Sequence, residues 1–176
     1  MSFPPDDLKE LLERISNILI RRNETIAVSE GACGGLLAAY LVSIPGASKF
    51  FDGGRLLYSL KSRLRLSGWD SKDISLYTVP SESGALKMAR NLRIELGSTY
   101  VLSETGIAGP SHSMAGDGDG SLSQNSIDLG TVYFGFWGPN GEESCTMHTG
   151  LSERSQNMQQ FARLGLQFLL SVLEKQ

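Results

Sequence analysis

The stretch that decides the fold runs from Thr25 to Tyr40 and reads TIAVSEGACGGLLAAY. An apolar β-type run enters a glycine-rich segment and continues as an apolar helical run, so the pattern predicts a strand, a tight turn and a helix. Small residues let a turn approach a ligand closely, and the first amides of a helix have no intrahelical partners. We therefore expect an anion such as a phosphate at this turn. The alternative is a tight structural connection, because the spacing fits neither the dinucleotide fingerprint nor the P-loop.

The segments around this stretch predict an alternation of helices and strands. Helical spacing of apolar residues predicts helices over 8–19, 34–42 and 81–96 and a final helix from residue 152, and β-rich runs predict strands at 25–29, 55–58, 99–103, 130–137 and 143–148. Residues 138–141 have the composition of a hairpin turn between the last two strands. The order favours one α/β domain over residues 1–176, with three layers and a mixed sheet.

The composition excludes several classes of protein. The chain has 176 residues, 16 basic and 19 acidic, and a net charge of −3, so electrostatic wrapping of nucleic acid is not expected. A basic run at Lys61, Arg63 and Arg65 is interpreted as a solvated helix face. The N-terminus lacks the pattern of a signal peptide, and no run reaches the roughly 20 apolar residues of a membrane span. We expect a cytoplasmic protein without a membrane partner.

Metal and cofactor sites are not expected either. Two cysteines, Cys33 and Cys145, make a disulfide framework unexpected and exclude a metal site built on cysteine pairs, and two histidines, His112 and His148, argue against a histidine-rich one. The segment 111–128 consists largely of Gly, Ser, Asp and Asn, which predicts a mobile loop. It resembles part of a calcium loop but lacks the closing glutamate spacing.

Six further motifs, taken together, carry a resemblance to a known family. They are EGACGGLL (30–37), IPGAS (44–48), Gly53-Gly54 with Tyr58, TGIAGP (105–110), LGTV (129–132), and Gly150 with Arg154. In order and spacing they resemble the CinA C-terminal domain family over roughly residues 8–173. The resemblance implies a single α/β domain, commonly a homodimer. It also implies a nicotinamide-nucleotide amidase, which hydrolyses the carboxamide of nicotinamide mononucleotide to nicotinate mononucleotide and ammonia without a metal.

This chain departs from the family pattern at the two residues that the resemblance makes catalytic. The pattern's serine, the presumed nucleophile, falls on Gly31, and its lysine, the presumed base, falls on Arg63, five positions after Tyr58. Glycine has no attacking atom, and arginine stays protonated at ordinary pH. Amide hydrolysis needs an attacking atom, an activating base and donors for the oxyanion.

Neighbouring residues offer substitutes for the missing pair. Cys33 and Ser29 are alternative nucleophiles, and Cys33 is favoured because a helix N-terminus stabilises a thiolate. The alternatives are a small buried hydrophobe for Cys33 and a strand-end residue for Ser29. Lys61 is an alternative base, or else a solvated helix residue. His112 and His148 are not predicted to be catalytic.

Tyr58 is a further catalytic candidate, which could bind or orient the ligand. The remaining candidates are ligand-binding residues, namely Glu30, Gly34, Gly35, Ser48, Thr105, Gly106 and Arg154. Glu30 has an alternative role in capping backbone amides, Tyr58 as a core residue and Thr105 as a turn hydrogen bond. Arg154 suits a phosphate or carboxylate. Three functions stay open: an amidase, an inactive nucleotide-binding or regulatory protein of the same fold, and a structural interaction protein that uses the 111–128 segment.

Overall fold

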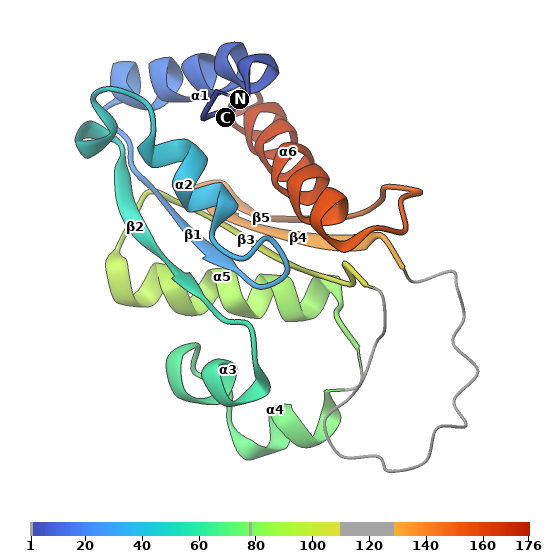
Figure 1. Ribbon diagram of the computed structural model, residues 1–176. Coiled ribbons are helices and arrows are strands. Elements are labelled where there is room, and N and C mark those ends of the chain that lie inside the picture. Colours follow the sequence, from blue (N-terminus) through green and yellow to red (C-terminus); the bar gives the residue numbers. More distant parts are fainter. Residues whose placement is uncertain (1, 78, 110–128) are drawn as a thin grey trace.

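A five-stranded mixed sheet forms the centre of the computed structural model, which describes residues 2–77, 79–109 and 129–176 (Figure 1). The strand order is β2-β1-β3-β4-β5. Strand β1 pairs in parallel with β2 and β3, and β3, β4 and β5 pair antiparallel. The strands are β1 (Ile26–Glu30), β2 (Phe51–Leu56), β3 (Tyr100–Gly106), β4 (Thr131–Gly138) and β5 (Gly141–His148).

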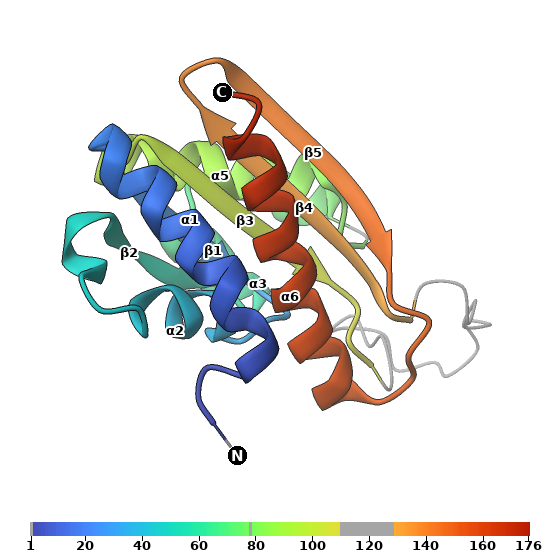
Figure 2. The ribbon, with the colours of Figure 1, turned by 90° about the horizontal axis from the view of Figure 1, so that it is seen from above.

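Helices cover both faces of the sheet and give the three layers. Helices α1, α2 and α6 lie on one face, where α1 and α2 pack against α6, and α5 lies on the other face together with α3 and α4 (Figures 1 and 2). The bounds are α1 (Lys9–Arg22), α2 (Leu36–Val42), α3 (Leu60–Leu66), α4 (Ser71–Leu76), α5 (Glu82–Leu96) and α6 (Arg154–Leu173), with short 3-10 turns at Asp6–Leu8 and Ala47–Lys49.

The helical spacing of the sequence explains which faces are buried. Leu12, Ile15 and Leu19 lie on one stripe of α1 and are fully buried, and the helix ends at Asn23, whose φ of 53° is left-handed. The large core lies between the sheet and α1, α2 and α6. A smaller cluster of Ala27, Ala89, Leu92 and Val101 lies between α5 and the opposite face of the sheet. Both faces of β1 are therefore buried, as expected of a central parallel strand.

The fold class predicted from the sequence is confirmed, and two local predictions differ from the structure. Strand β2 begins at Phe51, so Gly53 and Gly54 lie inside the strand and do not precede it. The basic run lies on α3, but Arg63 is only 5% exposed, so the interpretation as a solvated face is wrong for this residue and right for Lys61 and Arg65.

Two further expectations concern the segment 111–128 and the absence of a membrane span. The loop expected at 111–128 falls outside the described residues. Within the ranges that the structure describes, no helix is long and apolar enough to cross a bilayer.

Candidate functional site

The candidate site lies at the carboxyl ends of the parallel strands β1, β2 and β3. Glu30 ends β1 and pairs with Leu56 at the end of β2, and Glu104 to Gly106 close β3 beside them. Ligands of α/β proteins commonly bind at this edge of a sheet. The turn from Gly31 to Gly35 and the start of α2 lie at the same edge (Figure 1).

Glu30 caps the start of α2 from within the core. Its carboxylate accepts hydrogen bonds from the amides of Gly35, Leu37 and Ala38 at 3.0, 3.1 and 2.8 Å, and the residue is 1% exposed. Burial raises the pKa of Glu30, and the three amide bonds act in the opposite direction. The geometry thus supports the capping role among the two that the sequence left open.

Glu104, which sequence reasoning did not single out, does the same for the turn. One carboxylate oxygen, Oε1, accepts from the amides of Gly31 at 2.6 Å and Cys33 at 2.7 Å. Its other oxygen is buried without a hydrogen-bond partner. Burial is the main cause that raises the pKa of Glu104 to about 7. The sequence sign of this role is a glutamate that directly follows Val101, Leu102 and Ser103 in a buried strand, where a charged residue is unusual.

The carboxylates of Glu30 and Glu104 therefore accept hydrogen bonds from amides that we expected to face an anionic ligand. Five amides at the turn and the helix start bind Glu30 or Glu104. In particular, the amides of Gly31 and Cys33, at and just after the position of the family's serine, already bind the carboxylate of Glu104. The turn is consequently organised by the chain itself, and not by a bound phosphate.

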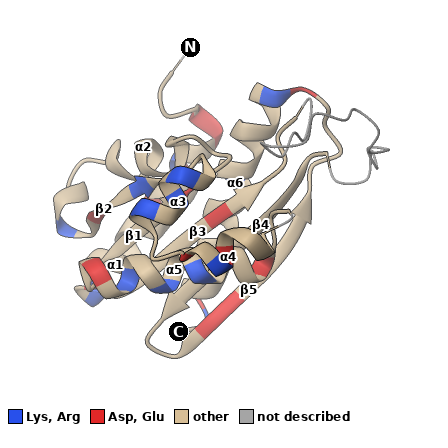
Figure 3. Cartoon of the chain, turned by 90° about the horizontal axis from the view of Figure 1, so that it is seen from below, with Lys and Arg blue, Asp and Glu red and all other residues tan. Residues whose placement is uncertain are grey.

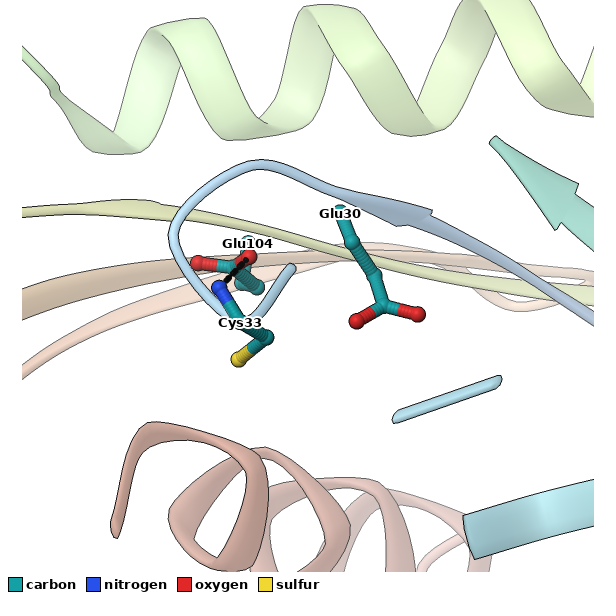
Figure 4. Close-up of side chains that lie close together, drawn as sticks. All are labelled: Glu30, Cys33 and Glu104. Carbon is teal, nitrogen blue, oxygen red and sulfur yellow. Dashed lines mark hydrogen bonds between the residues drawn. The ribbon is translucent and has the colours of Figure 1, made fainter. Parts of the chain in front are cut away.

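Cys33 lies inside this cluster (Figure 4). The Cys33 sulfur and oxygens of Glu30 and Glu104 lie within 4.8 Å of one another, and all three residues are buried. Burial, followed by the negative charges of Glu104 and Glu30, raises the pKa of the Cys33 thiol well above its ordinary value. A thiol so placed stays protonated at neutral pH and is a poor nucleophile. The cluster is of a different kind from the cysteine-pair and histidine sites considered from the sequence, and amide capping explains both carboxylates.

The positions of the family's serine and lysine lie side by side. A β-carbon added to Gly31 would lie 3.2 Å from Nη2 of Arg63 and 3.3 Å from the carbonyl oxygen of Glu104. The two positions that the resemblance makes catalytic are therefore neighbours in this structure. What stands there is a guanidinium beside a glycine, which offers neither an attacking atom nor a proton acceptor.

Hydrogen bonds and aromatic rings hold Arg63 in place. Its guanidinium donates to the hydroxyl of Thr105 at 2.8 Å, the carbonyl of Leu57 at 3.3 Å and the hydroxyl of Tyr77 at 3.3 Å. The guanidinium carbon lies 5.5 Å from the ring centre of Trp69 and 5.3 Å from that of Tyr77. Such cation–π contacts favour arginine over lysine.

A second arginine lies at the rim of the same edge. Arg154, at the start of α6, donates to the carbonyl of Gly109 at 2.6 Å and to the hydroxyl of Tyr58 at 3.0 Å. Tyr58 is 64% exposed, so its predicted alternative as a core residue is wrong. The structure thus joins the exposed Tyr58, the half-buried Arg154 and the turn that follows β3.

The other predicted residues lie in several places. Ser48 precedes β2, whose Phe51 pairs with Ile26 at the start of β1, so Ser48 lies at the opposite end of the sheet from the site. Lys61 is exposed, whereas the Ser29 hydroxyl is buried without a partner. The ring of His148 contacts the hydroxyl of Thr131, and His112 falls in the part of the chain left undescribed.

The glycines of the candidate set have conformational roles. Gly34 and Gly35 follow Cys33 with φ values of 66° and 101°, which favour glycine. Gly106 ends β3, and a β-carbon there would lie 2.7 Å from the carbonyl oxygen of Thr131. These positions shape the edge of the sheet that carries the candidate site.

Comparison with known proteins supports the motifs. The CinA C-terminal domain family matches residues 8–173. A CinA-like protein of Chlorobium limicola is 32% identical over 169 residues, which are 94% of this chain and 37% of that protein. A CinA-like protein of Frankia casuarinae is 35% identical over 127 residues, 72% of this chain and 27% of that protein. The chain thus spans about a third of the length of the curated relatives it matches.

Solved structures agree with the fold. A competence/damage inducible protein of Agrobacterium tumefaciens superposes with a TM-score of 0.83 at 25% identity, and the match covers 99% of both chains. A CinA superfamily protein of Klebsiella pneumoniae has the same fold, with a TM-score of 0.80 at 23% identity over 95% of this chain and 98% of that one. With the family match over nearly the whole sequence, these relatives show that this chain belongs to the CinA C-terminal domain family.

Proposed function

We propose that this chain binds a pyridine nucleotide at the carboxyl edge of β1 and β3 without hydrolysing its carboxamide. The observation that carries the proposal is that Gly31 and Arg63, which are neighbours in space, stand in place of both halves of the catalytic pair implied by the resemblance. Arginine cannot accept the proton that a general base must take up. The motifs that resemble the family are present at this edge of the sheet, but neither residue of the pair can act as a nucleophile or a base.

Two further observations argue against hydrolysis at this edge. The Cys33 thiol, the favoured substitute nucleophile, is buried and its pKa is raised well above the ordinary value. The amides of Gly31 and Cys33 are bound to Glu104, so they are not available to an oxyanion beside residue 31. An amidase needs an attacking group and donors for the oxyanion. Here the candidate thiol is buried, and the two amides already bind a carboxylate of the chain.

The test combines an activity assay with a binding assay on the same purified protein. Ammonia release from nicotinamide mononucleotide is measured without added metal, and binding of that compound and of its acid is measured by calorimetry. We expect binding without ammonia release. Turnover that disappears in Cys33→Ala would contradict the proposal and would establish an amidase with a rearranged site. Failure of both nucleotides to bind would also contradict the proposal, and only the family fold would remain.

A further inference from the structure

Arg63 is a buried cation without an anionic partner in the described part of the chain. It is 5% exposed, and its three hydrogen bonds go to a carbonyl and two hydroxyl groups, which are all neutral. None of the ion pairs among the described residues includes it. Buried charges in proteins are ordinarily paired, since desolvation of an unpaired ion is costly.

Glu30 and Glu104, the carboxylates at this edge of the sheet, do not form an ion pair with Arg63. Both oxygens of Glu30 and one oxygen of Glu104 accept backbone amides on the α2 side of the turn. Figure 3 shows Lys and Arg positions along α3 and α5 on this side of the molecule, together with Asp and Glu positions. Arg63 thus has no anionic partner within ion-pair distance among the described residues, and a bound anion would pair with it.

The guanidinium keeps donors for such an anion. A guanidinium has five N–H groups in a planar fork, and three hydrogen bonds account for three of them. The rings of Trp69 and Tyr77 lie against it at 5.5 and 5.3 Å and fix its plane. A planar fork held in this way suits a carboxylate, which accepts two parallel N–H bonds, better than a carboxamide, whose NH₂ group would face another donor.

We infer that Arg63, beside Gly31, is an acid-recognition residue that makes this chain bind the carboxylate form of a pyridine nucleotide in preference to the carboxamide form. The inference rests on the proposed function, because it uses the same edge of the sheet and the same class of ligand. Gly31 contributes by placing no side chain between its own backbone and Nη2 of Arg63. Arg154, with Tyr58 at the rim, offers a second cation for the phosphate of the same ligand.

The experiment compares two ligands that differ only in this group. Binding of nicotinate mononucleotide and nicotinamide mononucleotide to the full chain is measured by calorimetry, with ammonia release followed in parallel. Hydrogen bonds to a charged group predict that the acid binds about tenfold or more tightly than the amide. Arg63→Gln should abolish this preference and Arg63→Lys should reduce it. The matched control is Arg65→Gln, an exposed arginine on the same helix, which should leave the preference unchanged.

Each outcome decides between the two proposals. Equal affinities, or tighter binding of the amide, would overturn the acid preference while the proposed function stands. A preference that persists in a folded Arg63→Gln protein would overturn the role of Arg63. Ammonia release would overturn the proposed function, and the absence of any binding would overturn both. Should Arg63→Gln fail to fold, the ratio of the two affinities in the unaltered chain still tests the preference.

Discussion

Two buried glutamates act at the scale of single residues by organising the turn between β1 and α2. Glu104 has no cation among the causes that shift its pKa, and burial raises that pKa from an ordinary 4.5 to about 7. The folded protein therefore keeps a proton on Glu104 over a pH range in which the unfolded chain has already lost it. Its contribution to stability is fully present below pH 4.5 and is lost as the pH rises through about 7.

We expect the melting temperature to fall between pH 5 and pH 8, and Glu104→Gln to remove much of this fall. The predicted contribution is on the order of 3 kcal/mol, since each pKa unit corresponds to about 1.4 kcal/mol. Part of the slope should remain in the variant, because the pKa of Glu30 is raised in the same direction. Thermal unfolding at several pH values measures this, with the exposed Glu10→Gln as control. Identical pH profiles for Glu104→Gln and the unaltered chain would contradict the assignment.

The contact between Gly31 and Arg63 gives a second prediction at this scale. A side chain at position 31 would meet Nη2 of Arg63 at 3.2 Å, closer than ordinary packing. We expect Gly31→Ser to destabilise the protein by about 1–2 kcal/mol. In the double variant with Arg63→Lys, the loss should be smaller than the sum of the two single losses, because lysine removes the opposing nitrogen. Urea unfolding of the four proteins measures the coupling, and strict additivity would show that the two side chains do not meet.

Part of the site was readable from single residues and part was not. The family spacing located Gly31, Tyr58, Arg63 and Thr105, and the structure brings Arg63 together with Gly31 and Thr105. The role of Glu104 was missed, because a carboxylate that binds amides 71 and 73 residues away leaves no local pattern in the sequence. Glycine and helix-start signals predicted free amides, but they carry no information about a side chain that arrives from another strand.

At the scale of helices and strands, most elements were predicted, including the seven-residue α2 that follows the glycine turn, but the bounds of α3 and the existence of α4 were not. The alternation of helices and strands along the chain indicated the fold class, with the apolar stripe of α1 and the β-rich run of β4 as clear segments. Helices α3 and α4 have seven and six residues, too few for a helical period to stand out. Gly53 and Gly54 suggested a boundary before β2, but the strand continues through both, with a shift in register where Ala27 pairs with Gly53.

The packing of α5 on the sheet gives a prediction at this scale. Gly135 of β4 lies directly under α5, and a β-carbon there would be 2.6 Å from the Ala85 carbonyl carbon and 2.7 Å from the Leu86 amide nitrogen. Both atoms belong to the backbone, so α5 would have to move away from the sheet. We expect Gly135→Ala to cost about 1–3 kcal/mol or more in the free energy of unfolding.

The matched control for Gly135 is Gly84, which lies on α5 itself. A β-carbon at Gly84 would meet only the Ser81 hydroxyl, at 3.3 Å, and alanine favours a helix over glycine. We expect Gly84→Ala to be neutral or to stabilise the protein by up to about 1 kcal/mol. Chemical denaturation of both variants tests the pair. Equal effects would mean that α5 does not pack on Gly135 as described.

At the scale of the whole molecule, stability is distributed unevenly around the sheet. The large core joins α1, α2, α6 and one face of the sheet, while the cluster under α5 is small. The segment that carries α3 and α4 contributes little to either: α4 has no buried residue, and Arg63 is the buried residue of α3. The candidate ligand contact thus lies on a segment that belongs to neither hydrophobic cluster, and such segments open at lower free energy than the core.

Hydrogen exchange tests this distribution and its link to the ligand. Without ligand, we expect the amides of α3 and α4 to exchange well before those of β1 and β3, because local opening exposes little apolar surface there. Nicotinate mononucleotide at about 100 times its dissociation constant should slow exchange in α3 by up to roughly a hundredfold, since binding to Arg63 closes that opening. Exchange in α1, which lies on the other face of the sheet, should change little when α3 opens locally. Protection that rises equally in α1 and α3 would show that the ligand stabilises the fold as a whole and is not held by the segment around Arg63.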